Sequence, residues 1–220
     1  MPGKPLDPAN LQKDLGYTLN SITVTELLFA IHPPQVDRHV LEAGCGSGKL
    51  GLSYALHGAK VRLIDIDRGV TDYATQLYLL LEKTTQQRLQ VGIIQGNIFK
   101  LERLFGAEFD LFFSEGTTHH WSRKDWRRQA SINQMVKVCR HGGTVVVIGS
   151  NAMCPEMMDY AQRVDHTYMG MPPKQEPLDP SELEGRLVKA GLSPASITVA
   201  PVYSNDFATS TLLAGWGVKK

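Results

Sequence analysis

The chain has 220 residues, of which 42% are hydrophobic and 20% are charged, so it can bury a sizeable apolar core. Lys and Arg number 23 against 22 for Asp and Glu, which leaves no excess charge to attract nucleic acid or an anionic membrane. No apolar run approaches the ~20 residues of a membrane span, and the first ten residues lack a signal-peptide core. We therefore expect a soluble protein without a nucleic-acid or membrane partner.

The three cysteines are few and odd in number. Cys45, Cys139 and Cys154 show no C-x-x-C spacing, which argues against a disulfide framework and against a zinc site. The cytoplasm is the expected compartment, and no metal is expected.

The first half of the chain alternates strand and helix patterns. A short buried-strand pattern at 39–43 leads through a glycine-rich turn into a helix for which Gly58 is the expected C-cap. A strand at 60–67 is followed by a helix at 71–86 and a strand at 89–96. This order is typical of βαβ units.

The second half continues the alternation. A strand at 109–116 and an amphipathic helix at 125–139 precede a fifth strand at 142–150. Asp179 and Pro180 are expected to begin another helix as its N-cap and first residue. The chain then closes with two strand patterns, at 195–205 and 207–217.

Continuous strand–helix alternation predicts an α/β fold. Right-handed crossovers place helices on both faces of a doubly wound, mostly parallel sheet. One domain is expected over residues 1–220, with a helical extension at 1–37 and a core at 38–150. An expected substrate cap at 151–180 precedes the closing helix and strand pair at 181–220.

Four glycines lie at the end of the first expected strand, in "VLEAGCGSGKLG" (40–51). Glycine permits backbone conformations and close approaches that other residues do not, and ligands of such sheets bind at this edge. The cluster therefore predicts a ligand-binding loop. A P-loop is excluded because Ala43 and Leu50 occupy positions that require Gly and Ser or Thr.

A dinucleotide is harder to exclude than a P-loop phosphate as the ligand of this loop. Gly46, Gly48 and Gly51 satisfy G-x-G-x-x-G, and Asp65 lies near the distance expected for a ribose-binding acid. Glu42, however, places a carboxylate where a pyrophosphate would approach. A positively charged ligand without phosphate would instead be attracted by it.

The segment "LEAGCGSG" resembles the acid and G-x-G-x-G turn of class I S-adenosylmethionine (SAM)-dependent methyltransferases. "VRLIDID", "QGNIFKL", "FDLFFSEGTTHHW" and "CRHGGTVVVIG" resemble later motifs of that family in the right order. Asn97 replaces the more usual Asp of the third motif, and His141 stands where Pro is commoner. The resemblance covers 38–150 and implies a Rossmann-like, seven-stranded sheet with an antiparallel strand at 207–217.

The resemblance also implies cofactor contacts. Asp65 would accept hydrogen bonds from both ribose hydroxyls, and Ile66 would pack on the adenine face. Asn97 and Ile98 would line the adenine edge, while Glu42 would support the loop and attract the ammonium group. The full set expected to bind SAM is Glu42, Gly44, Cys45, Gly46, Gly48, Asp65, Ile66, Asn97, Ile98, Ser114 and Tyr17.

Chemistry is expected after the strand at 109–116. Methyl transfer is an in-line displacement in which the protein mainly orients the acceptor, so a general base is optional. His120 and His119 could take a proton from a hydroxyl or protonated amine, and Glu115 could hydrogen-bond the acceptor. Packing roles for the histidines and a helix-capping role for Glu115 are the alternatives.

Substrate choice is expected to depend on the segment 151–180, which is rich in methionine and aromatic residues. Such a segment could cap an apolar pocket or pack as a helix on the sheet edge. We expect methyl transfer to O or N of a small molecule by a monomer or a homodimer. The alternatives are an NAD(P)-dependent oxidoreductase and a non-catalytic SAM-binding protein.

Overall fold

The computed structural model describes residues 8–20, 23–118, 126–154, 176–202 and 212–220. The chain divides into two compact units, Met1–Ile98 and Phe99–Lys220. None of the helices in the described ranges combines the length and apolar character that a membrane crossing requires.

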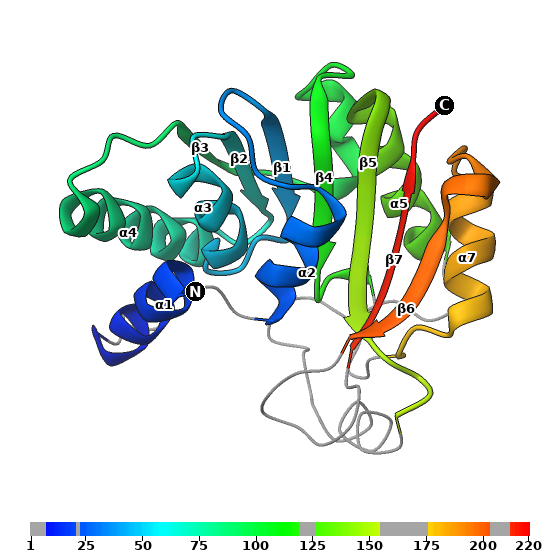
Figure 1. Ribbon diagram of the computed structural model, residues 1–220, viewed down its shortest axis with the longest axis horizontal. Coiled ribbons are helices and arrows are strands. Elements are labelled where there is room, and N and C mark those ends of the chain that lie inside the picture. The colour runs from blue at the N-terminus through cyan, green and yellow to red at the C-terminus, as the bar shows by residue number, and fades with distance from the viewer. Residues whose placement is uncertain (1–7, 21–22, 119–125, 155–175, 203–211) are drawn as a thin grey trace. The chain divides into compact units, whose positions relative to one another are not determined.

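The first unit contains three strands and four helices among its described residues. In chain order they are α1 (Pro8–Asn20), α2 (Thr23–Ile31), β1 (His39–Ala43), α3 (Lys49–Leu56), β2 (Lys60–Asp65), α4 (Arg68–Thr85) and β3 (Val91–Gln95). The strands are parallel in the order β3-β2-β1. Helices α3 and α4 pack on these strands, and α1 contacts both helices (Figure 1).

The register of these strands brings their carboxyl ends to one edge of the sheet. Ala43 pairs with Ile64, and Asp65 pairs with Gln95. The glycine loop after β1 and the residues after β2 and β3 therefore lie near one another, as expected for a ligand site in an α/β sheet.

Local signals explain the helix limits in this unit. Helix α4 begins earlier than predicted because the Asp67 side chain accepts a hydrogen bond from the Val70 N–H (3.2 Å) and caps the first turn. Helix α3 ends at its C-cap His57, and Gly58 follows with a φ of 86°. Gly58, the predicted C-cap, is therefore the residue after the C-cap, a position where a positive φ favours glycine.

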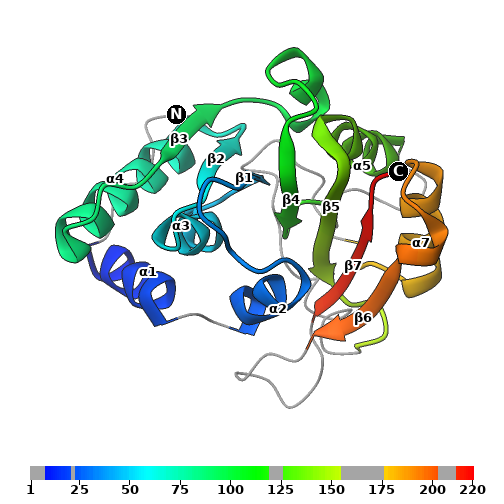
Figure 2. The same ribbon diagram turned by 45° about the horizontal axis from the view of Figure 1, so that its top comes forward.

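The second unit contains four strands among its described residues. In chain order its elements are η1 (Ile98–Arg103, which begins on the last residue of the first unit), β4 (Phe109–Glu115), α5 (Trp126–Val138), β5 (Cys139–Ser150), α7 (Pro180–Lys189), η4 (Pro194–Ser196), β6 (Thr198–Val202) and β7 (Leu212–Val218). Their order is β4-β5-β7-β6, and β7 runs antiparallel to both of its neighbours (Figure 2). Helix α5 packs on β4 and β5, α7 packs on β6 and β7, and the two helices contact each other.

Strand β5 begins at Cys139, three residues before the predicted start at Gly142. Cys139 pairs with Phe109, and the register then shifts until Thr144 pairs with Leu111. Gly142, with a φ of 75°, lies within this irregular stretch. The chain thus passes from α5 into the strand through a bulge, which apolar periodicity did not reveal.

Helix α7 begins as predicted. The Asp179 carboxylate accepts hydrogen bonds from the Ser181 and Glu182 N–H groups, and Pro180 occupies the first turn. With the mostly parallel strands and the antiparallel final strand, these features confirm the predicted α/β class.

Candidate functional site

The glycine loop follows β1 and contains three residues with positive φ. Gly44, Gly46 and Gly48 have φ angles of 65°, 54° and 77°, a region that other residues rarely occupy. The Gly44 N–H donates to the carbonyl oxygen of Ile64 at 2.8 Å. The loop is thereby fastened to the carboxyl end of β2.

The glycines of this loop differ in their surroundings. A Cβ atom on Gly48 would lie 2.6 Å from Leu63 Cδ1, and one on Gly51 would lie 2.5 Å from Leu63 Cδ2. A Cβ atom on Gly46 would meet no heavy atom within 4 Å. Gly48 and Gly51 therefore let α3 pack closely on β2, whereas Gly46 borders space that a ligand can occupy.

Glu42 is the acid that precedes the loop. Its side chain is buried, and its Oε2 accepts a hydrogen bond from the Gly51 N–H at 2.9 Å. Gly51 is the third residue of α3, where an N–H has no partner within the helix, so the carboxylate caps the positive end of the helix dipole. This contact supports the turn from the loop into α3.

Asp65 ends β2 and holds the loop from the other side. Its Oδ2 accepts a hydrogen bond from the Gly46 N–H (3.2 Å), and its Oδ1 accepts one from the Asp67 N–H (3.0 Å). Burial raises the pKa of Asp65 above its usual value, although these two N–H groups oppose the shift. Two carboxylate oxygens offer about four acceptor positions, so further donors such as ribose hydroxyls can be accommodated.

Ile66 and Asn97 follow the carboxyl ends of β2 and β3, respectively. Ile66 is 55% exposed although it is apolar, and its carbonyl oxygen accepts a hydrogen bond from the Gln95 side-chain amide (3.2 Å). Asn97 and Ile98 are half-buried. This edge of the sheet thus offers an exposed apolar side chain near an amide, a combination that suits a planar heterocycle.

Tyr17 on α1 lies beside two lysines. The Nζ atoms of Lys49 and Lys13 are 5.4 and 5.5 Å from the centroid of its ring, within cation–π range. Lys49 directly follows Gly48 and begins α3. Neither lysine was predicted to lie at the site, although the position of Lys49 directly after Gly48 is a signal that could have indicated it.

Cys45 is buried within the loop, and its thiol lies 3.7 Å from the Gly46 carbonyl oxygen. Burial raises the pKa of this thiol strongly, and the negative charges of Glu42 and Asp65 raise it further. The thiol therefore stays protonated, so it is no nucleophile at neutral pH.

The residues expected near the chemistry belong to the second unit. Ser114 is fully buried in β4, and Glu115 is half-buried at its end. Gly116 follows with a φ of 72° and marks the end of the strand. His119 and His120 lie outside the described residues.

Comparisons with known proteins show which family and fold this chain resembles. Residues 40–143 match the sequence model of a family described as a methyltransferase domain. None of the curated proteins matches the chain in sequence.

Solved structures extend the similarity to nearly the whole chain. Magnesium protoporphyrin IX methyltransferase from Synechocystis PCC 6803, with bound S-adenosylhomocysteine (SAH), has a TM-score of 0.67 and 15% identity over 99% of this chain and 89% of that one. A SAM-dependent methyltransferase from Aquifex aeolicus has a TM-score of 0.65 and 17% identity over 98% of this chain and 100% of that one. An O-methyltransferase family protein from Burkholderia thailandensis has a TM-score of 0.68 and 12% identity over 94% of this chain and 58% of that one.

These structures define the fold as that of the Rossmann-like methyltransferases. The match over 40–143 identifies a methyltransferase domain in this part of the chain, and together with these folds it supports a class I SAM-dependent methyltransferase with SAM as its cofactor. The dinucleotide-like spacing of Gly46, Gly48 and Gly51 also has a structural reason, since Gly51 serves the packing of α3 on β2.

Proposed function

We propose that this methyltransferase acts on an oxygen or nitrogen atom of a small organic molecule. The observation that carries the acceptor class is the composition of 151–180, where methionine and aromatic residues suit an irregular or planar apolar ligand. The nearly balanced charge of the chain gives no reason to expect a nucleic-acid acceptor. Two of the similar structures, a porphyrin methyltransferase and an O-methyltransferase family protein, are compatible with this choice.

The cofactor contacts of this proposal begin with Asp65, which would accept hydrogen bonds from the two ribose hydroxyls. Its carboxylate already lies beside the open space at Gly46. Ile66 would cover the adenine face, with Asn97 and Ile98 along the adenine edge. The backbone of Gly44, Gly46 and Gly48 and the side chains of Glu42, Cys45, Ser114 and Tyr17 complete the proposed set.

Lys49 joins this set as a proposed partner of the cofactor's carboxylate. Its ammonium group lies against the ring of Tyr17. In sequence, Lys49 directly follows Gly48, the N-cap of α3. A Lys49→Gln variant with unchanged SAH affinity would remove the residue from the site.

We assign to Glu115 a hydrogen bond with the acceptor. We assign the removal of the acceptor's proton to His120, with His119 as the second candidate. Bound SAM supplies an activated methyl group. When the acceptor is methylated, the histidine would take up the proton that the acceptor loses. We expect His120→Ala to slow turnover without changing SAH affinity. Turnover rates that are equal across pH would rule out His120 as a general base.

We further propose that 1–220 acts as one catalytic domain with 151–180 as its substrate cap, in a reducing compartment such as the cytoplasm. Cys45, Cys139 and Cys154 are buried and do not form disulfide bonds among the described residues, which suits such a compartment.

A two-part experiment tests the proposal. Calorimetric titration with SAH and, separately, NADH is expected to give binding only with SAH. Purified protein with methyl-labelled SAM is then supplied with hydroxyl-containing and amine-containing small molecules, and labelled product is separated from SAM. SAH binding without transfer to any acceptor would favour a non-catalytic binder, whereas transfer to added RNA or protein instead would contradict the acceptor class.

A further inference from the structure

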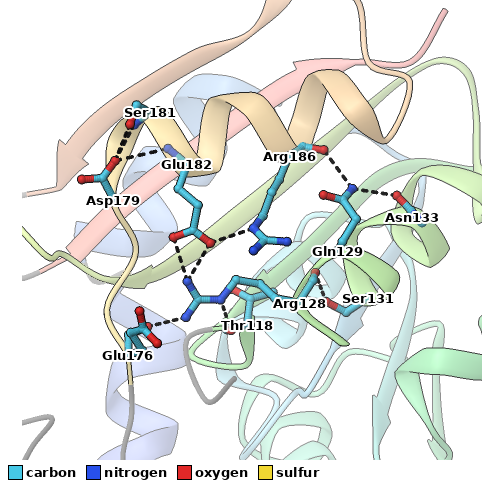
Figure 3. A network of polar contacts seen from close by, with 10 residues as sticks. All are labelled: Thr118, Arg128, Gln129, Ser131, Asn133, Glu176, Asp179, Ser181, Glu182 and Arg186. Atoms are coloured by element: carbon cyan, nitrogen blue, oxygen red, sulfur yellow. Dashed lines mark hydrogen bonds and ion pairs between the residues drawn. The ribbon is translucent and has the colours of Figure 1, made fainter. Parts of the chain in front are cut away.

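A buried arginine joins two helices to two non-helical segments in the second unit. Arg128 lies on α5 with a fully buried side chain, and its Nη1 donates to both carboxylate oxygens of Glu182 on α7 (2.9 and 3.0 Å). Its Nε donates to the Thr118 carbonyl oxygen at 3.2 Å, and its Nη2 donates to the Glu176 carbonyl oxygen. Figure 3 shows these groups converging on one guanidinium.

The two carbonyls belong to segments that the proposed function places around the acceptor. Thr118 follows β4 and directly precedes the two candidate histidines. Glu176 lies two residues before Leu178, whose N–H donates to the Ser150 carbonyl oxygen at the end of β5 (2.7 Å). The guanidinium therefore holds the backbone where the histidine stretch begins and near the end of 151–180.

The Thr118 side chain does not anchor this backbone itself. Its Oγ1 is buried and has no hydrogen-bond partner among the described residues, a costly state for a hydroxyl. The attachment of Thr118 to α5 therefore runs through its carbonyl oxygen and Arg128.

Stability alone explains this arrangement poorly. Burial lowers the pKa of Arg128, and the nearby Glu182 carboxylate opposes the shift, as expected for a cation removed from water. Buried ion pairs can often be replaced by apolar side chains without loss of stability. A planar guanidinium, however, offers five donors in fixed directions, and here it reaches Glu182, Thr118 and Glu176 at once.

We propose that Arg128 is a positioning residue for methyl transfer: it holds the backbone of Thr118, which precedes the candidate histidines, in fixed relation to that of Glu176, near the end of the proposed acceptor segment. This inference rests on the proposed function, because only an acceptor bound by these segments makes their relative placement matter to the rate. It does not require Arg128 to touch the acceptor or the cofactor.

The test compares two matched substitutions at one carboxylate. Arg128→Lys keeps the charge but removes the fork that reaches the two carbonyls. Arg186→Lys is the control, because Arg186 on α7 donates to the same Glu182 carboxylate through its Nε (2.7 Å). Each variant is measured for thermal unfolding, SAH affinity, and kcat and KM with an acceptor found in the labelled-methyl screen.

For Arg128→Lys we expect kcat/KM for the acceptor to decrease at least tenfold while SAH affinity changes less than twofold. Arg186→Lys should keep kcat/KM within twofold, even if its unfolding temperature shifts as much as that of Arg128→Lys. An unchanged kcat/KM in Arg128→Lys, or an equal loss in Arg186→Lys, would overturn the positioning role. If Arg128→Lys does not fold, Glu182→Asp, which withdraws the carboxylate but keeps its charge, carries the same expectation.

Hydrogen–deuterium exchange separates this inference from the proposed function. Without any acceptor, Arg128→Lys should accelerate exchange in peptides containing Thr118 and Glu176, and Arg186→Lys should not. Unchanged exchange would refute the inference. Failure of every acceptor in the screen, with the exchange difference present, would instead count against the proposed function and leave the anchoring by Arg128 supported.

Discussion

Asp65 is an acid whose protonation should control cofactor affinity. Only its ionised form can accept hydrogen bonds from both ribose hydroxyls while holding the Gly46 N–H. Because burial raises its pKa, SAH affinity should be constant at neutral pH and decrease as the pH falls through that raised pKa, earlier than an ordinary Asp would predict. Calorimetric titration between pH 8 and pH 5 measures this dependence.

Variants of Asp65 provide the controls for that profile. Asp65→Ala should weaken SAH binding at least tenfold, about 1.4 kcal/mol, and should remove the component of the pH dependence due to this group. Asp65→Asn should also flatten the profile, since an amide does not titrate. Unchanged affinity in Asp65→Ala would place the ribose elsewhere.

Two loop glycines should separate ligand binding from folding. Gly46→Ala adds a methyl group to open space at a φ of 54°, so it should cost roughly 1–2 kcal/mol of stability but weaken SAH binding tenfold or more. Gly51→Ala would bring Cβ within 2.8 Å of Glu42 Oε2 and closer still to Leu63. Overpacking of roughly 1–3 kcal/mol should exceed its gain in helix propensity.

Urea unfolding and SAH titration of both glycine variants measure these effects. The expected pattern is a mainly ligand-binding defect in Gly46→Ala and a mainly folding defect in Gly51→Ala. If Gly46→Ala bound SAH as tightly as the unchanged protein, the cofactor would not approach the loop at this residue.

The residue types in the sequence were enough to predict part of this site but not the rest. The loop glycines and Asp65 could be singled out because their chemistry is specific to a turn and to a strand end. The hydrogen bond that the Gly51 N–H donates to the Glu42 carboxylate depends on how α3 packs against β1 and β2. The partners of Arg128 lie 10, 48 and 54 positions away, beyond what spacing within one helix can indicate.

The first and last residues of helices and strands are likewise determined partly by local sequence and partly by contacts between distant residues. The strand at 39–43 was predicted with its observed bounds, since Val40, Leu41 and Ala43 form a short buried-strand pattern and the turn that follows is rich in glycine. Helix α4 begins at Arg68 instead of Thr71 because Asp67 caps it, a local signal that was overlooked. The early start of β5 depends on pairing between Cys139 and Phe109, so only the tertiary structure determines it.

The N-cap of α7 gives a prediction at the scale of one element. Asp179→Ala should reduce the free energy of unfolding by about 1 kcal/mol, because its carboxylate accepts from two backbone N–H groups and from the Ser181 hydroxyl. Asp179→Asn keeps a capping oxygen and should stay within a few tenths of a kcal/mol. Urea unfolding that gave the same loss in both variants would show that the charge, not the cap, stabilises α7.

At the scale of the molecule, the fold followed from sequence because the alternation of strands and helices leaves few topologies open. The antiparallel β7 followed from a closing strand pair without an intervening helix. The acceptor is a different matter, because methyltransferases share one fold while their substrates depend on segments outside the common core. Here the segment that we propose for this role is 151–180, and the proposal rests mainly on its composition.

Cofactor binding should raise the stability of the whole protein. A ligand at 100 times its dissociation constant stabilises the folded state by about 2.7 kcal/mol, which for a chain of this length corresponds to an increase of roughly 5–10 °C in unfolding temperature. SAH should produce this shift in a thermal scan, whereas NADH at the same concentration should not. In Asp65→Ala, tenfold weaker binding should remove about 1.4 kcal/mol of the effect, so that about half of the shift remains at the same SAH concentration. A full shift in Asp65→Ala, or an equal shift with NADH, would mean that the stabilising ligand does not depend on the carboxylate at the end of β2.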